Sequence, residues 1–126
     1  MADKTVNGYY GSDLNRFIDK YCSHEMTVNN IDLIIYKVSK KHIRIIESKH
    51  EMENMPKSQY SLLQKLARQS KIFDCELEVL IIKGNPPYNT AEIINLTTGQ
   101  KVVVSHSELI KYLNFEDIKL NWVQKE

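Results

Sequence analysis

The alternation of apolar and polar residues predicts a β-hairpin over residues 32–49. Two short runs rich in isoleucine are separated by a polar turn at residues 39–41, which is the pattern of two adjacent strands. Successive side chains of a strand point to opposite faces of the sheet, so the second strand presents two different sets of side chains. One set consists of Ile43, Ile45, Glu47 and Lys49, and the other of Arg44, Ile46 and Ser48.

The first of these faces is unusual because an acid and a base follow two isoleucines. At the position of Glu47, strand propensity and packing favour another isoleucine or valine, and burying an unpaired carboxylate costs free energy. Either Glu47 and Lys49 form an ion pair at a solvated end of the strand, or the strand leaves the core there, or the two residues belong to a site. In the third interpretation, Asp32 lies beside Glu47, the two carboxylates bind a metal ion, and Lys49 reaches over it.

Helical spacing predicts helices before and after this hairpin. Ser12 is a suitable N-cap for a helix over residues 13–22. Pro56 opens a second helix, which carries one apolar stripe and ends near Ser70. A capping box that starts at Ser105 predicts a last helix.

Three further segments have the pattern of strands. Residues 76–83 begin in alternation and end in a continuous apolar run, and the helix that connects them to the strand of Glu47 favours a parallel pair. Residues 91–96 and 101–105 predict a second hairpin. The expected fold is α/β, with a central mixed sheet flanked by helices, in the order helix–strand–strand–helix–strand followed by a hairpin and a helix. We expect Trp122, in the short tail, to pack onto this body.

An Asp on one strand followed by Glu-x-Lys on the next resembles the PD-(D/E)XK nuclease superfamily. The matching residues are Asp32, which follows Ile31, and the run Glu47, Ser48 and Lys49. The Pro of the pattern is absent, and the acid is kept. The resemblance covers roughly residues 10–83, and it implies a restriction-endonuclease-like core.

Two neighbouring segments add to the resemblance. Gln59 lies in the first turn of the second predicted helix, which is similar to the VRR-NUC branch of the superfamily. The opening helix resembles that of archaeal Holliday-junction resolvases, in which a Glu stands where this chain has Asn15. Asp13, Asp19 or Glu25 is an alternative source of a third acid, and the sequence leaves that choice open.

The resemblance implies a metal-dependent nuclease that hydrolyses phosphodiester bonds. Two carboxylates are suitable ligands for Mg²⁺ or Mn²⁺, and such an ion activates a bound water. Asp32 and Glu47 are the expected metal ligands together with the carbonyl of Ser48, while Lys49 orients the water and Gln59 lines the site. We expect nucleic acid as the partner, with DNA as the substrate, structure-selective cutting and a homodimer, because so short a chain has little room to embrace a duplex or to read bases.

Other functions compete with this interpretation. A catalytically inactive nucleic-acid-binding module of the same fold, or a small interaction protein in which Glu47 and Lys49 merely pair, has the same pattern. The run Asn85-Pro86-Pro87-Tyr88 matches the loop in which DNA N6-adenine methyltransferases hold a flipped base. The chain has 4 glycines and no Gly-rich loop for a methyl donor, so a rigid turn is the favoured interpretation of this run.

Composition is that of an ordinary globular protein, with 42% hydrophobic and 26% charged residues. The 126 residues suit one domain, and the net charge of +1 gives no strong electrostatic signal. Cys22 and Cys75 are expected to be reduced thiols, and with no apolar run of membrane-spanning length we expect a cytoplasmic protein with no membrane partner. Basic residues crowd the central hairpin, namely Lys37, Lys40, Lys41, His42, Arg44, Lys49 and His50.

Overall fold

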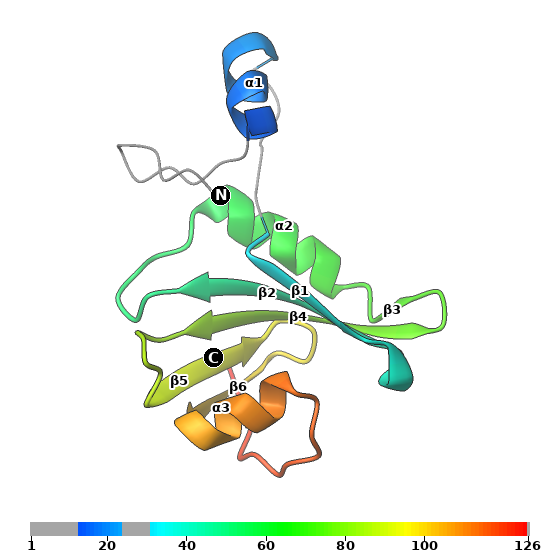
Figure 1. Ribbon diagram of the computed structural model, residues 1–126, viewed down its shortest axis with the longest axis vertical. Helices are drawn as coiled ribbons and strands as arrows, with labels where there is room; N and C mark the ends of the chain where they lie inside the picture. The colour runs from blue at the N-terminus through cyan, green and yellow to red at the C-terminus, as the bar shows by residue number, and fades with distance from the viewer. Residues whose placement is uncertain (1–12, 24–30, 126) are drawn as a thin grey trace. The chain divides into compact units, whose positions relative to one another are not determined.

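The computed structural model describes residues 13–23 and 31–125 (Figure 1). The chain divides into two units, Met1–Asn30 and Ile31–Glu126, and each is considered by itself. In the first unit, α1 spans Asp13–Tyr21, as the helical spacing predicts. Its Phe17 and Tyr21 rings lie 4.9 Å apart on the apolar stripe. The proposed N-cap at Ser12 lies outside the described residues.

In the second unit, the described residues form an α/β layer structure around one mixed sheet (Figure 1). The strand order is β1-β2-β4-β5-β6-β7, and the short β3 pairs with β4. β2 and β4 are parallel, whereas the other pairs are antiparallel. The strands are β1 (Leu33–Lys37), β2 (His42–Lys49), β3 (Lys71–Ile72), β4 (Cys75–Lys83), β5 (Thr90–Asn95), β6 (Gln100–Ser105) and β7 (Val123–Gln124).

The predicted hairpin of β1 and β2 is confirmed. Its turn is a short 3-10 helix, Val38–Lys40, followed by Lys41 in the left-handed conformation at φ 50°. Leu33 lies opposite Ile46 in the antiparallel register. The predicted alternation along β2 also holds, because Ile45 and Ile46 are buried in different cores on the two faces of the sheet.

Helix α2, Lys57–Ala67, connects β2 to β4 and makes them parallel, as its pattern predicts. It begins directly after Pro56 and ends three residues before the predicted end near Ser70. Leu63 is 2% exposed and packs into the core on this face of the sheet. The apolar stripe of α2 therefore covers the face of β2 that also carries Glu47.

The other face of the sheet is covered by α3, His106–Leu113. The capping box predicted from the sequence is present, since the Ser105 side chain accepts from the N–H of Glu108 and the Glu108 side chain accepts in return. Tyr112 and Trp122 lie with their ring centroids 5.9 Å apart, so the tail does pack onto the body. With one helix on each face, the sheet has a buried core on both sides.

Three short elements were not predicted: β3, β7 and the 3-10 turn. The chain between β3 and β4 turns at Phe73, which has φ 53° and is 98% exposed. A left-handed conformation costs a bulky residue about 1–3 kcal/mol. Among the described residues, no helix is long and apolar enough to cross a membrane. Cys22 and Cys75 are free thiols.

Candidate functional site

The residues singled out by the Glu-x-Lys pattern lie at the carboxyl ends of the parallel strands β2 and β4, on the face covered by α2. Glu47 lies beside Ile81 and Lys49 beside Lys83 in this pair. Open α/β sheets bind ligands outside the carboxyl ends of their parallel strands. The location is therefore one at which a site is expected on topological grounds alone.

Asp32 is placed next to Glu47 by the register of the hairpin. β1 begins at Leu33, which pairs with Ile46, so continuing the register by one residue places Asp32 across from Glu47. The Oδ2 atom of Asp32 accepts a hydrogen bond of 2.9 Å from the N–H of Ser48, which fixes the carboxylate at this end of β2. The charge of Asp32 raises the pKa of Glu47, so the two carboxylates interact.

Glu47 is an acid buried without full compensation. It is 3% exposed, and its Oε1 atom has no hydrogen-bond partner. Its Oε2 atom lies 3.3 Å from Nζ of Lys49. Burial and then the charge of Asp32 raise the pKa of Glu47, and Lys49 and Gln59 counteract this shift only in part. The protein thus holds a carboxylate in a place that disfavours its charge.

Lys49 lies between two carboxylates. Its ammonium is 3.3 Å from Glu47 and 3.6 Å from Oε2 of Glu53, and its side chain is 10% exposed. A turn positions Glu53, since its Oε1 atom accepts from the N–H of His50 at 3.0 Å. That hydrogen bond is the main cause that lowers the pKa of Glu53. The sequence reasoning missed Glu53, because a loop acid carries no periodic signal and only this turn brings it back to Lys49.

Gln59 reaches the same place from the first turn of α2. Burial raises the pKa of Glu47, and a hydrogen-bonding contribution from the Gln59 side chain counteracts a part of that shift, so the amide lies against that carboxylate. Its own Oε1 atom is buried without a hydrogen-bond partner. The structure therefore brings Asp32, Glu47, Lys49 and Gln59 together.

The carbonyl of Ser48 is directed toward Asp32 by the geometry of the strand. The N–H and C=O of one strand residue point to the same neighbour. The N–H of Ser48 donates to Asp32, whereas the next carbonyl, that of Lys49, accepts from Gly84 at 3.0 Å on the side of β4. The oxygen of Ser48 therefore points toward the side of β2 on which Asp32 lies.

All the acids that the sequence offers as a third metal ligand belong to the first unit. Asp13 and Asp19 lie on α1 in the other unit, and the side chain of Asn15 and the whole of Glu25 lie outside the described residues. Within the residues that the structure describes, no group of three or more His, Cys, Asp or Glu side chains is arranged to hold a metal ion. The site in the second unit offers two carboxylates and a backbone carbonyl.

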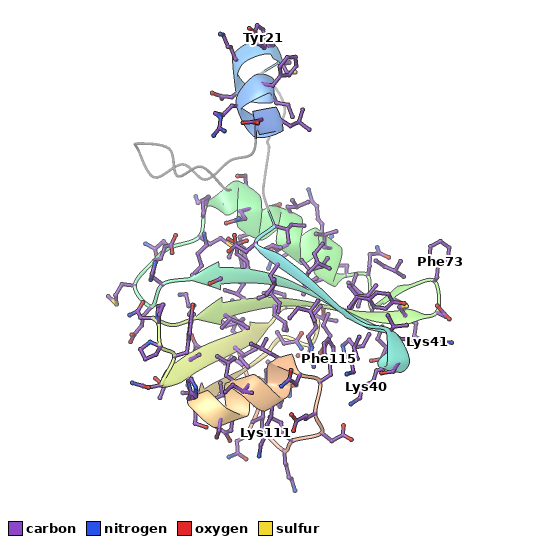
Figure 2. All side chains as sticks on the ribbon, viewed as in Figure 1. Tyr21, Lys40, Lys41, Phe73, Lys111 and Phe115 are labelled. Atoms are coloured by element: carbon purple, nitrogen blue, oxygen red, sulfur yellow. The ribbon has the colours of Figure 1, made fainter. Side chains whose placement is uncertain are left out.

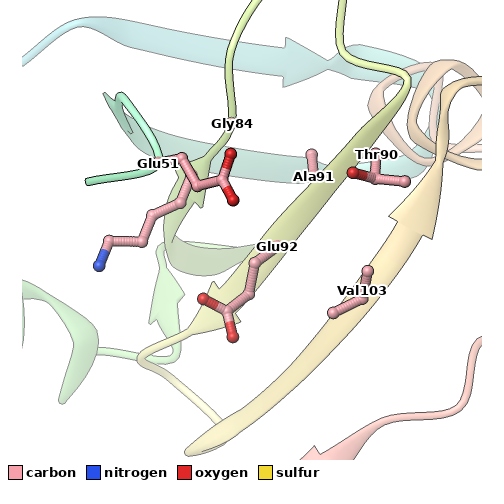
Figure 3. A pocket seen from close by; sticks show the side chains of 7 residues that line it. Glu51, Gly84, Thr90, Ala91, Glu92 and Val103 are labelled. Carbon is pink, nitrogen blue, oxygen red and sulfur yellow. The ribbon is translucent and has the colours of Figure 1, made fainter. Parts of the chain in front are cut away.

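A small hollow lies at the carboxyl end of β4, and one of its lining residues, Lys83, pairs with Lys49. It has a volume of about 200 Å³, and Figure 3 shows the carboxylates of Glu51 and Glu92 on its walls. Asn85 positions Glu51, which lines the hollow: its Oδ1 atom accepts from the N–H of Glu51 at 3.3 Å and lies 3.1 Å from Nδ1 of His50. The loop that begins at Asn85 is a turn leaving the sheet, as predicted, and it ties the end of β4 to the end of β2.

A second polar cluster lies at the opposite end of β2 and on the opposite face. Arg44 is 7% exposed and donates to Glu78 at 3.1 Å, while the rings of Tyr112 and Phe115 lie 4.0 and 4.1 Å from its guanidinium carbon. Asn95 also donates to Glu78, at 2.8 Å. Every charge of this cluster has a partner, so it resembles a structural network rather than a site poised for a ligand.

The chain matches no protein-family model, no curated protein and no solved structure. What the site can do therefore follows from its own groups: two neighbouring carboxylates, one ammonium and one amide, with two buried oxygens that lack partners.

Proposed function

We propose that the protein is a metal-dependent nuclease, with a restriction-endonuclease-like core, that hydrolyses phosphodiester bonds in DNA. The observation that carries the proposal is the burial of Glu47 with one unpartnered oxygen beside a second carboxylate. In the protein alone, both burial and the charge of Asp32 disfavour the Glu47 carboxylate, and the ion pair with Lys49 offsets this cost only in part. A cation shared by the two side chains removes both penalties.

The oxygens available suit Mg²⁺ or Mn²⁺. These hard cations bind proteins through one or two carboxylates and keep several waters, so two acids and one carbonyl are sufficient. Asp32, Glu47 and the carbonyl of Ser48 are the proposed ligands. When bound, the ion lowers the pKa of a coordinated water and polarises the phosphodiester.

Lys49 is proposed to act on the attacking water and on the developing charge of the phosphate. Its ammonium is nearly buried and held between Glu47 and Glu53, so it needs little reorganisation to face a substrate. Gln59 is proposed to accept a hydrogen bond from the same water, because its Oε1 atom is buried and has no partner. Both side chains then orient a nucleophile that the metal activates.

The substrate is proposed to be DNA of irregular shape, such as a branch, rather than a defined base sequence. Base readout needs side chains placed in a groove, and one chain of 126 residues leaves few for it. We propose a homodimer for the same reason, since two copies present a larger surface to a duplex.

A catalytically inactive nucleic-acid-binding module is the second candidate. The observation that favours it is that, within the described residues, no three acidic, His or Cys side chains are arranged to hold a metal ion, since Glu53 lies against Lys49. This candidate predicts binding that weakens with salt but no cleavage.

The deciding experiment incubates the purified protein with branched, single-stranded and duplex DNA in Mg²⁺, in Mn²⁺ and in EDTA. Glu47→Gln and Lys49→Met are each expected to lower the cleavage rate by about 100-fold or more. Glu116→Gln, which changes an exposed acid far from the site in sequence, is the matched control and should cleave like wild type. Cleavage that survives both site substitutions removes this assignment, and binding without cleavage by wild type favours the inactive module.

A further inference from the structure

Phe73 is the most exposed large hydrophobic side chain among the described residues, at 98%. It stands at the tip of the hairpin between β3 and β4, and Figure 2 shows its ring projecting away from the sheet. Its neighbour Ile72 is also exposed, at 42%. An apolar ring in this position has no role in either core.

The backbone conformation of Phe73 is unfavourable for a bulky residue, so the stability of the fold does not explain why Phe occupies this position. β3 ends at Ile72 and β4 begins at Cys75, so the hairpin has a two-residue loop with Phe73 first. At this position φ is 53°, a conformation that favours Gly or Asn in such loops. The exposed ring makes no packing contact that offsets the strain. A strained residue without internal compensation suggests a contact outside the chain.

Two lysines belong to the same end of the sheet as this ring, Lys41 and Lys71. Lys41 pairs with Asp74 at 3.0 Å, and both side chains are more than half exposed, at 64% and 68%. Figure 2 shows Lys41 at the same end of the sheet as Phe73. Lys71 is exposed two residues before the ring, in β3. Exposed aromatic rings and lysines on one surface are the combination by which proteins hold single-stranded nucleic acid, since the rings stack bases and the amines contact phosphates.

We propose that Phe73 stacks an unpaired base of the nucleic-acid substrate, while Lys41 and Lys71 contact the adjacent phosphates. The inference rests on the proposed function, because it takes nucleic acid as the ligand. The hairpin lies at the start of β2, where the N–H of Glu76 donates to the carbonyl of Lys41, and the candidate site lies at the other end of that strand. Strand β2 has 8 residues, which at about 3.3 Å each span the length of about eight stacked nucleotides.

The test measures binding in EDTA, so that cleavage plays no part. A single-stranded oligonucleotide with one 2-aminopurine is titrated with wild type, Phe73→Asn and Phe73→Trp. Asn suits the left-handed conformation and removes the aromatic ring, whereas Trp keeps an aromatic surface. Val123→Asn replaces a half-exposed apolar residue of β7 and is the matched control. Melting temperatures are recorded for every variant.

We expect Phe73→Asn to weaken binding by about 5- to 150-fold, since stacking contributes about 1–3 kcal/mol per base. The 2-aminopurine quenching should disappear, the melting temperature should not fall, and Phe73→Trp and Val123→Asn should bind like wild type. Unchanged affinity and quenching in Phe73→Asn overturn the proposal. The same result is expected if the ring contacts a protein rather than a base. The nuclease proposal is judged separately in Mg²⁺: Phe73-dependent binding without cleavage overturns the nuclease and keeps the stacking platform.

Discussion

Replacing Glu47 by Gln should stabilise the fold while it abolishes the proposed activity. The perturbation removes a negative charge from a side chain that is 3% exposed and leaves its shape unchanged. In wild type, the Oε1 atom has no partner and burial raises the pKa of the carboxyl. A structural ion pair with Lys49 predicts the opposite sign, so the measurement separates the two interpretations of this strand.

The size of the effect follows from the groups involved. A buried polar group without a partner costs about 1–3 kcal/mol, and more when it is charged. Gln keeps polar atoms in the same place, so the variant removes only the part of this cost that the charge adds. The ion pair with Lys49 at 3.3 Å offsets part of this cost, and that attraction is lost in the variant. We therefore expect a net gain of about 1 kcal/mol in the free energy of unfolding. With about 2.1 cal/mol/K of unfolding entropy per residue, a chain of 126 residues gains about 4 °C in melting temperature per kcal/mol.

The dependence on pH gives an internal check of the sign. Because the folded-state pKa of Glu47 is raised above 4.5, ionisation destabilises the fold as the pH rises from 4.5 through the raised value. The variant has no such group. The difference in stability between the two proteins should grow as the pH rises from about 4.5 through the raised pKa of Glu47, and it should vanish below about pH 4.5, where wild type is protonated in both states.

Divalent metal should reverse the order of stability. Melting curves are recorded in EDTA and then in Mg²⁺ or Mn²⁺ at about ten times the dissociation constant, which stabilises the metal-binding protein by about 1.4 kcal/mol. Wild type should gain about 5 °C and the variant almost nothing. A variant that is less stable than wild type at neutral pH in EDTA refutes the reasoning, because Lys49 would then compensate the charge of Glu47 fully.

Two further substitutions test the electrostatics on the two faces of the sheet. Lys49→Met should destabilise the fold by about 3–5 kcal/mol, because it leaves a buried carboxylate without its counter-ion. Urea denaturation should show a smaller loss in acid, where Glu47 is neutral, than at neutral pH. An equal loss in acid and at neutral pH would contradict this account. Glu78→Gln should also cost about 3–5 kcal/mol, because Arg44 is buried against that carboxylate. Burial raises the pKa of Glu78, but the hydrogen bond and charge of Arg44 outweigh it and the net shift is downward. The stability that Glu78 contributes is therefore complete above pH 4.5 and is lost as the pH falls through its lowered pKa. The loss of stability in Glu78→Gln should accordingly disappear in strong acid. The exposed Glu76→Gln is the control for this measurement.

Much of the architecture was predictable because it depends on local periodicity. The alternation in β2, the stripe of α2 and the capping box at Ser105 each involve residues close in the chain, and each element formed as expected. The parallel pairing of β2 with β4 followed from the helix between them. The short strands β3 and β7 carry two residues each, too few to give a periodic signal.

The sequence by itself determined which groups stand at the end of β2, because a face that runs from isoleucine to Glu47 and Lys49 is visible from spacing alone. Only the tertiary structure decided that Asp32 lies across from Glu47 and that Gln59 approaches it from α2, since pairing register and helix packing join residues distant in the chain. It also decided that Glu53 returns to Lys49 and that Phe73 is left strained and exposed. The physical reason is common to all four cases: burial and electrostatic coupling depend on distances in space, which local sequence patterns do not encode.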